Sequence, residues 1–598
     1  MVCQINTHAA YLDPILIHHR PSDLLQILIL AQDHYGYIHS DAIDHLSLRL
    51  QLPRSKIEGV ASFYSFLHLQ PPGAYRVLFS DNITDRMSGS VALMESMCSQ
   101  LWVEPGKLSE DNLLSIDTTS CTGMCDQGPA MLVNGLAINR LTQDRVNAIS
   151  ELIREQVPVS AWPAIFFSIE DHIQRRDILL DSHFQSGSAL TALLLRGTDE
   201  TLQQIKASLL RGRGGAGFST GAKWELCRQA AGNARFVVCN ADEGEPGTFK
   251  DRVLLNNFAD MVFEGMTLCA RILGAKQGFL YLRGEYRYLL NHLQAVLQRR
   301  RQQGLLGNDI LGHADFNFDI DIHLGAGAYI CGEESALIES LEGKRGTPRN
   351  RPPFPVTHGY LNMPTVVNNV ETFAAASLIA LNGGAWYAGI GTGTSSGTKI
   401  LSVSGDCDCP GIYEYPYGVT VAQVLADCGA RDTQAVQISG PSGVCIAPDE
   451  FERRIAFEDI PTAGAFMVFN RSRDMFEVAR NFVHFFAHES CGFCTPCRIG
   501  TSLLSNMMDK LANGYGSPYD FAEIEKLNAL LQSNSHCGLG HSACNPVLDT
   551  IAKFRPAYDK RLAHKDFVPA FDLDRALSQA RQMTGRNDTG AHLERSDD

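Results

Sequence analysis

The sequence predicts a multidomain α/β protein, and three observations lead to this prediction. The chain has 598 residues, and at about 150 residues per domain this length favours roughly four domains. Hydrophobic residues make up 44% of the chain and charged residues 20%, which is typical of folded globular proteins. Short apolar runs with strand character alternate with helical patterns through much of the chain, as they do in α/β domains.

Charge and hydropathy exclude several classes of protein. The 66 acidic residues outnumber the 51 basic ones, and the formal net charge is −15, so broad binding to nucleic acid is not expected. The best apolar run, residues 24–31, is far shorter than the ~20 residues of a membrane helix. The first residues lack the basic segment and apolar core of a secretory signal. We therefore expect no nucleic-acid partner and no membrane span.

The first part of the chain, residues 1–155, is expected to hold a helical bundle followed by an α/β domain. Apolar periodicity predicts helices at residues 24–31, from Ser40 onward, and at residues 54–67, where Pro53 is placed to begin the helix. Strand-like runs then follow at residues 75–79 and 130–133. Residues 158–163 are expected to form a linker.

Three further domains and a tail are predicted after the linker. Residues 156–395 are rich in glycine, with strands expected at 235–239 and 278–282, and a parallel α/β domain is the interpretation. Residues 396–470 alternate strand-like runs and turns and predict a small β-rich domain. Residues 471–583 are helical in pattern. The polar tail, residues 584–598, is expected to be mobile.

A glycine-rich loop at residues 211–218 has the spacing Gly-x-Gly-x-x-Gly. Gly212, Gly214 and Gly217, with Gly215 between them, would let backbone amides approach a phosphate closely. Arg211, Arg213 and Lys223 add positive charge near the loop, which suits a phosphate monoester. The spacing alone is a weak signal, so a flexible surface turn and an RGG-type nucleic-acid segment are alternatives. The acidic balance of the chain and the single copy disfavour the second of these.

Carboxylates and glycines follow an apolar strand in two places. The first place, residues 236–247, ends in polar groups where α/β proteins bind ligands, at the carboxyl end of a sheet. The second, residues 325–335, repeats the pattern. Carboxylates suit sugar hydroxyls because each can accept two hydrogen bonds from them, although a solvated acidic turn is an equally simple interpretation. The candidate residues are Asn240, Asp242, Glu243 and Glu245 in the first place, and Gly332, Glu333 and Glu334 in the second.

Cysteines form one cluster with the spacing of a metal centre. Cys491, Cys494 and Cys497 form C-x-x-C-x-x-C, and Cys537 lies forty residues further along. Three closely spaced thiolates and a distant fourth are typical of a [4Fe–4S] cluster. A structural zinc ion, which four cysteines also suit, is the alternative. Cys544 is expected to lie at an ordinary helix end and not to be a ligand. The odd total of 17 cysteines favours reduced thiols over a disulfide framework.

Together these motifs resemble the NADH-binding flavoprotein subunit of respiratory complex I and its relatives. The resemblance rests on RGRGGAGFSTGAKW at 211–224, CNADEGEPGTFKDR at 239–252, GAYICGEESALIESLEGKRGTPRNRPPFP at 327–355, PTVVNNVET at 364–372 and ESCGFCTPCRIGT at 489–501, and it runs in order from about residue 200 to 575. It implies a Rossmann-like domain for FMN and NADH, a ubiquitin-like β-grasp module and a helical bundle with one [4Fe–4S] cluster.

The resemblance also implies roles for individual residues. Glu245 and Glu334 would orient NADH, Leu226 stands where relatives often have an aromatic residue, and Arg351 stands where they often have Lys. Backbone amides of residues 212–217 would hold the flavin phosphate. Phe218 and Phe354 would enclose the adenine of NADH, with Glu333 close by. Flavin positions carried over from the family are Gly212, Gly214, Gly215, Lys223, Asn240, Asp242, Glu243, Asn368 and Asn369.

The front of the chain resembles the thioredoxin-like partner of this flavoprotein, which holds a [2Fe–2S] cluster on two cysteine pairs. The matching stretches are YGYI at 35–38, GVASFYSF at 59–66 and CTGMCDQGPAMLVN at 121–134. Cys121 and Cys125 fit the second pair, but Ser80 and Asp85 stand where the first pair is expected. Hydroxyl and carboxylate oxygens are hard donors that replace thiolate poorly, so we expect no [2Fe–2S] cluster here and a scaffold role for residues 1–155.

A fused chain of this kind most resembles the diaphorase subunit of cytoplasmic NAD-reducing [NiFe] hydrogenases. The resemblance implies a cytoplasmic oxidoreductase that transfers electrons between NAD(H), FMN and a [4Fe–4S] cluster. Its partners would be an iron–sulfur subunit like the N-terminal part of the complex I 75 kDa subunit, and the small and large hydrogenase subunits, so that H₂ oxidation is coupled to NAD⁺ reduction. The flavoprotein of an NAD-dependent formate dehydrogenase, complex I itself and a non-catalytic scaffold are the alternatives.

Overall fold

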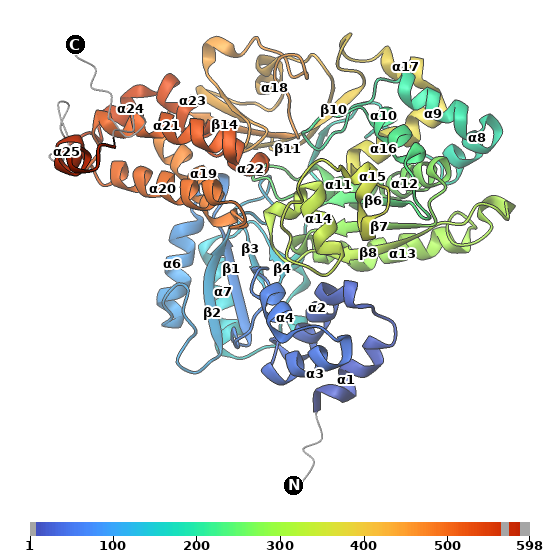
Figure 1. Cartoon of the computed structure of the whole chain (residues 1–598), viewed down its shortest axis with the longest axis horizontal. Coiled ribbons are helices and arrows are strands. Elements are labelled where there is room, and N and C mark those ends of the chain that lie inside the picture. Colours follow the sequence, from blue (N-terminus) through green and yellow to red (C-terminus); the bar gives the residue numbers. More distant parts are fainter. Residues whose placement is uncertain (1–6, 564–572, 587–598) are drawn as a thin grey trace, which may run out of the picture.

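The computed structural model describes residues 7–563 and 573–586 (Figure 1). The chain begins with four short helices, and Figure 1 draws them in blue beneath the rest of the molecule. The helix predicted at residues 54–67 is shorter than expected and ends at Ala61. The amides of Ser65 and Phe66 instead donate to carbonyls at Gly327 and Ala326, far along the chain. The helices are α1 (Thr7–Leu16), α2 (Leu24–Tyr35), α3 (Ser40–Leu50) and α4 (Arg54–Ala61).

A mixed sheet of four strands follows, in the order β2-β1-β3-β4. Strand β1 runs parallel to β2 and antiparallel to β3. Helices α6 and α7 cover the sheet and enclose a core that includes Val77, Ile116 and Ile149. The expected α/β domain is therefore present in residues 75–155. Its elements are β1 (Tyr75–Ser80), α5 (Ile83–Met87), α6 (Ser90–Leu101), β2 (Leu114–Thr119), β3 (Met131–Val133), β4 (Leu136–Ile138) and α7 (Gln143–Arg154).

The central sheet is fully parallel, with the order β8-β7-β6-β9. Helices α12 and α16 pack together beside β6, and their facing sides are apolar and buried. Since parallel strands end at the same edge, this sheet brings the ends of β6 and β9 together. The strands are β6 (Phe236–Ala241), β7 (Gln277–Leu282), β8 (Asp319–Leu324) and β9 (Thr365–Asn369). The helices are α8 (Ser188–Arg196), α9 (Thr198–Ala207), α10 (Thr220–Gln229), α11 (Lys250–Asn257), α12 (Ala259–Leu273), α13 (Leu290–Gln302), α14 (Glu334–Leu341), α15 (Pro355–His358), α16 (Val370–Asn382) and α17 (Gly384–Ala388).

A third sheet has six strands, in the order β13-β12-β14-β10-β11-β5. Its edge strand β5 (Ile173–Arg175) comes from the segment that joins the first two domains, and it pairs with β11. The buried carboxylate of Glu414 holds the next residues in place, because it accepts hydrogen bonds from the amides of Asp177 and Leu179. The other elements are β10 (Thr398–Gly405), β11 (Gly411–Pro416), α18 (Val421–Asp427), β12 (Thr433–Ile438), β13 (Val444–Ile446) and β14 (Ala465–Asn470).

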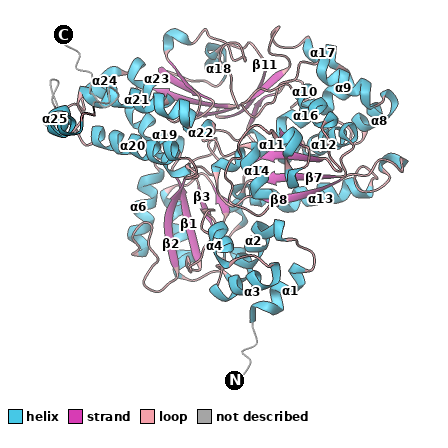
Figure 2. Ribbon diagram, viewed as in Figure 1, coloured by secondary structure: helices cyan, strands magenta, loops and turns pink. Residues whose placement is uncertain are grey.

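The last part of the chain is helical (Figure 2). Its helices are α19 (Met475–Glu489), α20 (Thr495–Ala512), α21 (Pro518–Asn534), α22 (Gly538–Ser542), α23 (Asn545–Lys553), α24 (Arg555–Asp559) and α25 (Leu573–Thr584). Most of the expected tail, residues 587–598, lies outside the described residues. Within the described ranges, none of the helices combines the length and apolarity needed to cross a bilayer.

Candidate active site

A cavity of about 600 Å³ opens where β6 and β9 of the parallel sheet end. The glycine-rich loop forms part of its wall, and residues before and within α14 form another part. Most of the candidate residues from the sequence meet here. The lining residues are Gly212, Gly214, Ala216, Gly217, Phe218, Lys223, Leu226, Asn240, Gly332, Glu333, Glu334, Arg351, Phe354, Val356, Val367, Asn368, Asn369 and Gly538.

The glycine-rich loop faces the cavity with its backbone. A Cβ added at Gly214 would lie 3.2 Å from the Cβ of Asn369, and Gly217 has a φ of +62°, where larger side chains are strained. The side chain of Arg211 closes the loop, because its Nε donates to the carbonyl of Gly217 at 2.6 Å. Helix α10 begins just after the loop, and the hydroxyl of Ser219 caps it. The loop therefore leaves room for a ligand beside its backbone.

The side chain of Arg213 does not line the cavity, contrary to the expectation that it adds charge for a phosphate there. It is 1% exposed, and its guanidinium donates to the hydroxyl of Tyr387 at 2.8 Å and to the carbonyl of Ser396 at 2.7 Å. It also lies over the ring of Tyr417. These partners turn it away from the cavity and toward the third sheet. Gly215 also lies off the cavity wall, with Ala463 next to it.

Two ion pairs place charge on the cavity wall. The Nζ of Lys223 lies 3.0 Å from the carboxylate of Glu334 and also donates to the carbonyl of Val367. Arg351 pairs with Glu333 at 3.0 Å. The other oxygen of Glu333 accepts the first amides of α14. Both carboxylates are thus held in fixed positions at one side of the cavity.

Three acidic candidates lie behind the wall of this cavity. Asp242 lines a separate cavity of about 160 Å³. Glu243 accepts hydrogen bonds from the amide of Asp251 and the hydroxyl of Tyr286, and burial raises its pKa to about 7. Glu245 accepts from the hydroxyl of Tyr329 and the amide of Ser442, and burial raises its pKa as well. These residues support the wall and do not line the cavity.

A buried ionic network that sequence reasoning missed holds Asn369 in place. The side-chain amide of Asn369 donates to Asp251 at 2.6 Å, and its oxygen accepts from Lys250 at 3.1 Å. Lys250 and Lys399 share the carboxylate of Glu371, at 3.1 and 2.5 Å. The only signal in the sequence was that Lys250 and Asp251 follow the acidic motif directly. Their partners come from α16 and β10, which no local pattern could reveal.

The four candidate metal ligands line one small cavity. Cys491, Cys494, Cys497 and Cys537 surround it, together with Ile330, Pro348, Ser490, Phe493, His536 and Leu539. Burial raises the pKa of Cys497 to about 11 and that of Cys537 to about 12, so a cation is needed to hold them as thiolates. Cys544 is buried and does not line this cavity.

The four thiols are arranged around a cavity. A [4Fe–4S] cluster binds each sulfur at a different corner, so this arrangement fits it. A zinc ion would bring the sulfurs to about 2.3 Å from one point. The cysteine cavity also lies beside the large one, because Cys537 lines the first and Gly538 lines the second.

The four positions that correspond to [2Fe–2S] ligands are close together and buried. Ser80 donates to the carboxylate of Asp85 at 2.7 Å, and the sulfurs of Cys121 and Cys125 lie 3.6 Å apart. Burial raises the pKa of Asp85 well above its usual value. A Cβ at Gly128 would lie 2.4 Å from Asp85. The hydrogen bond between Ser80 and Asp85 therefore occupies the two oxygen-bearing positions of this site.

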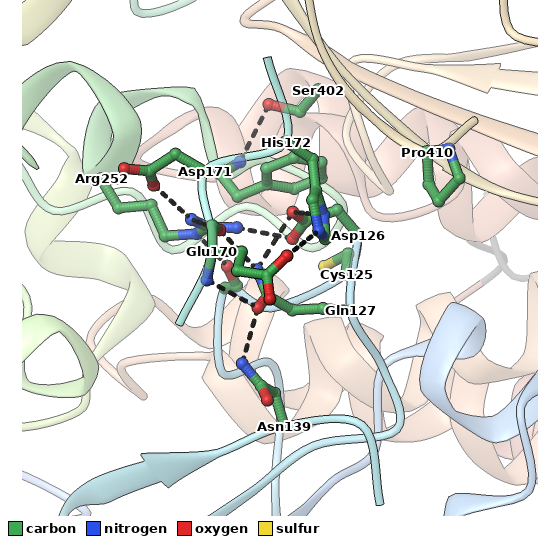
Figure 3. Close-up of polar contacts among 12 residues, drawn as sticks. Cys125, Asp126, Gln127, Asn139, Glu170, Asp171, His172, Arg252, Ser402 and Pro410 are labelled. Carbon is green, nitrogen blue, oxygen red and sulfur yellow. Dashed lines mark hydrogen bonds and ion pairs between the residues drawn. The ribbon is translucent and has the colours of Figure 1, made fainter. Parts of the chain in front are cut away.

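A buried arginine attaches this cysteine loop to the rest of the molecule (Figure 3). Arg252 of α11 is fully buried and donates to Asp126 at 2.6 Å and to Asp171 at 3.1 Å. It also donates to the carbonyl of Gly123 at 3.0 Å. His172 contacts the other oxygen of Asp126 at 2.9 Å, and this hydrogen bond raises the pKa of His172. Three segments of the chain thus meet at one guanidinium.

Comparisons with known families agree with this arrangement. Residues 12–154 match the thioredoxin-like [2Fe-2S] ferredoxin family, residues 205–377 match the Nuo51 FMN-binding domain, and residues 477–561 match the NADH-ubiquinone oxidoreductase-F iron-sulfur binding region. The third match includes all four cysteines of the small cavity. A thioredoxin-like domain, an FMN-binding domain and a 4Fe-4S binding region are therefore present in this order.

Individual relatives match most of the chain. The NAD-reducing hydrogenase HoxS subunit alpha of Cupriavidus necator is 43% identical over 93% of this chain and 94% of its own length. An NADH-quinone oxidoreductase relative from Escherichia coli is 40% identical over 62% of this chain and 85% of its own length. A crystal structure of NAD⁺-reducing [NiFe]-hydrogenase in the H₂-reduced state has a chain with a TM-score of 0.88 and 43% identity, covering 96% of this chain and 99% of that chain. The chain belongs to the family of the alpha subunits of NAD-reducing hydrogenases.

Proposed function

We propose that the chain is the diaphorase subunit of an NAD-reducing hydrogenase, an NADH:acceptor oxidoreductase in which FMN occupies the large cavity and a [4Fe–4S] cluster occupies the cysteine cavity. The observation that carries the proposal is that the two cavities are neighbours. Gly538 lines the large cavity, and the adjacent Cys537 lines the cysteine cavity. In the same way, Gly332 lines the large cavity and Ile330 lines the cysteine cavity. A two-electron carrier and a one-electron carrier would therefore lie side by side.

The residues on the cavity wall fit a flavin mononucleotide. The volume of about 600 Å³ is within the usual range for cofactor sites. Gly212, Gly214 and Gly217 bring backbone within reach of a phosphate, and at Gly214 a side chain would crowd Asn369. Flavin, when bound, accepts a hydride from NADH and releases its electrons one at a time. We assign Lys223, Asn240, Asn368 and Asn369 to holding it.

Two aromatic side chains at the cavity suit the adenine of NAD(H). Phe218 and Phe354 both line the cavity, and each is 51% exposed, which leaves ring surface for a stacked base. Leu226 is also partly exposed there, so the enclosure is apolar but not fully aromatic. Glu333 and Glu334 offer carboxylates to ribose hydroxyls. Glu334 is the residue we assign to orienting the nucleotide, and Glu245 would act through Tyr329.

Positioning is the main task of these residues. Hydride exchange requires the donor and acceptor rings to stack closely, so an ordered pocket provides most of the catalysis. Lys223 fixes the carboxylate of Glu334. The network of Lys250, Asp251 and Glu371 fixes Asn369. The side chains of Glu334 and Asn369 are therefore held in position before the reaction begins.

The finer architecture belongs to the same proposal. We assign residues 396–470 to a ubiquitin-like β-grasp module, which is supported by the packing of α18 on a sheet of mixed direction. We assign residues 471–583 to a helical bundle that carries the cluster. Residues 1–155 and 156–395 remain our proposed limits for the first two domains, except that β5 joins the third sheet. A cytoplasmic location is proposed because every described cysteine is a free thiol.

The proposed partners follow from the relatives. The relative that covers nearly the whole chain is named as a hydrogenase subunit, whereas the quinone oxidoreductase relative matches only about two thirds of it. We therefore propose an iron–sulfur subunit as the next electron carrier and nickel–iron subunits as the site of H₂ oxidation. A chain of complex I or of an NAD-dependent formate dehydrogenase is the alternative, which co-purifying subunits would reveal.

The substitution Glu334→Ala tests the assignment. Loss of a hydrogen bond to a charged group costs about 1.5–3 kcal/mol, so kcat/KM for NADH with ferricyanide should fall about tenfold to a hundredfold. The flavin content should stay unchanged, because Glu334 is assigned to NADH. Glu477→Gln, on α19 and away from the cavity, is the control. Unchanged kinetics in the Glu334 variant would contradict the assignment.

A further inference from the structure

Cys121 and Cys125 form an isolated pair of thiols in the first α/β domain. Their sulfurs lie 3.6 Å apart, and the side chains are 1% and 6% exposed. The proposed electron path from NADH through flavin to the C-terminal cysteines does not use them. Ser80 and Asp85, at the other two positions of the family pattern, are hydrogen-bonded to each other. The two thiols are therefore left facing each other.

The two sulfurs already lie close to each other. An S–S bond is about 2.0 Å long, so sulfurs that lie 3.6 Å apart need to approach each other for a disulfide to form. The residues between the two cysteines include Gly123, which has a φ of +73°. The turn that brings the thiols together is thus built into the backbone.

The surroundings of the pair stabilise a thiolate on Cys121. The amide of Gly123 lies 3.4 Å from its sulfur, and Asn82 donates to the sulfur of Cys125 at 3.0 Å. Hydrogen bonding from Cys125 and the positive charge of Arg283 lower the pKa of Cys121 to about 7, against the effect of burial. A thiolate beside a neutral thiol is the arrangement that starts thiol–disulfide chemistry.

We propose that Cys121 and Cys125 are a redox-active dithiol, which hydrogen peroxide or a comparably small oxidant converts to a disulfide and which dithiol reductants restore. In the first step the Cys121 thiol attacks peroxide, so that the O–O bond breaks, one water leaves and a sulfenic acid forms. In the second step Cys125 attacks that sulfur, the S–S bond forms and a second water leaves. Two electrons pass from sulfur to peroxide, and both thiol protons end in water.

A cavity of about 160 Å³ lies close to the cysteine loop, and its lining includes Ser120, the residue before Cys121, together with Thr119 and Arg283. Neither Cys121 nor Cys125 lines it, and both side chains are buried, so only a small oxidant is expected to reach them. The disulfide would also affect the flavin domain, because Arg283 donates to the carbonyl of Cys121 and Arg252 donates to the carbonyl of Gly123.

Peptide mapping of the oxidised whole chain tests the proposal. The purified holoenzyme is treated with hydrogen peroxide, its free thiols are alkylated in denaturant, and its peptides are analysed by mass spectrometry without reduction. We expect a peptide pair linked through Cys121 and Cys125, which disappears after dithiothreitol. Titration in dithiothreitol redox buffers should follow a single two-electron transition. Oxidation of the exposed Cys409 shows that the reagent acted.

Variants and iron analysis complete the design. Cys121→Ser and Cys125→Ser should each abolish the linked peptide, whereas Cys98→Ser, which changes another buried thiol of the same domain, should keep it. The proposal is wrong if Cys121 and Cys125 are alkylated separately while Cys409 is oxidised, or if either links to another cysteine. It is also wrong if the chain binds about six irons per flavin with the extra two on this pair, because a [2Fe–2S] cluster would then occupy it. Peptide mapping of the chain without substitutions decides the question even if a variant fails to fold.

Discussion

Replacing Arg252 with Met should detach the N-terminal domain from the flavin domain. Arg252 is fully buried, and the carboxylate of Asp126 that faces it is 1% exposed. Removing one partner of a buried ion pair typically costs about 3–5 kcal/mol, and in this variant the carboxylate of Asp126 keeps only its contact with His172 as an ion-pair partner. The substitution also removes the hydrogen bond to Gly123. We therefore expect a loss of stability near the upper end of this range.

Hydrogen exchange measures this loss where it occurs. The slowest amides of β1 and α7 report the free energy of opening of the N-terminal domain. The pH dependence provides a second check, because Arg252 holds the pKa of Asp126 below its usual value of 3.8. This contribution is present above pH 3.8 and is lost as the pH falls through the lowered pKa, so the two proteins should converge in acid.

The control for this experiment is an ion pair on the surface. Arg431 pairs with Asp408, but the side chains are 83% and 56% exposed, and such pairs contribute little because water screens them. Arg431→Met should therefore leave the exchange of β1 and α7 unchanged. A loss below about 1 kcal/mol in the Arg252 variant, which is the scale of an exposed pair, would refute the view that this guanidinium joins the domains.

Four further predictions follow from the structure. Asp126 raises the pKa of His172 above 6.5, so its contribution to stability should be complete below pH 6.5 and be lost as the pH rises through the raised pKa, and His172→Gln should flatten this decline. Gly214→Ala should lower flavin occupancy, measured by absorbance of the purified chain, because a Cβ there meets Asn369 at 3.2 Å. The chain expressed alone should bind about four irons per flavin, and Cys497→Ser should lose them while flavin is retained. Deletion of residues 1–155 should lower both assembly with partner subunits and thermal stability, and the protein that still folds should keep its flavin. If the truncated chain assembles and melts like the full chain, the domain has no scaffold role.

Local patterns were sufficient to find the candidate site. The glycine spacing, the polar groups at residues 332–334 and the C-x-x-C-x-x-C motif are each defined within about ten residues, and each contributes residues to one of the two cavities. The carboxylates of Asp242, Glu243 and Glu245 do not line the large cavity. Such features depend on backbone geometry, which short segments determine by themselves. The neighbouring positions of the two cavities became apparent only in the structure, where Cys537 lines one and Gly538 lines the other.

Side-chain direction and long-range pairing could not be read from the sequence. Arg213 stands in a loop that suits phosphate, yet its guanidinium is taken by Tyr387 and Ser396 from distant segments. The helix from Arg54 was expected to continue to Leu67, but bonds to Gly327 replace its last turn. In both cases the competing partner lies more than a hundred residues away, where periodicity carries no information.

The pairing of β5 with β11 has a consequence for synthesis of the chain on the ribosome. The amide of Leu179 meets the carboxylate of Glu414, a residue 235 positions later. The segment after the N-terminal domain therefore has no folded partner until the whole flavin domain and part of the third have been translated. Domains usually fold in order as they emerge, but β5 can pair only after β11 has been translated. In a nascent chain the strand at residues 173–175 therefore stays without its sheet partner until that point.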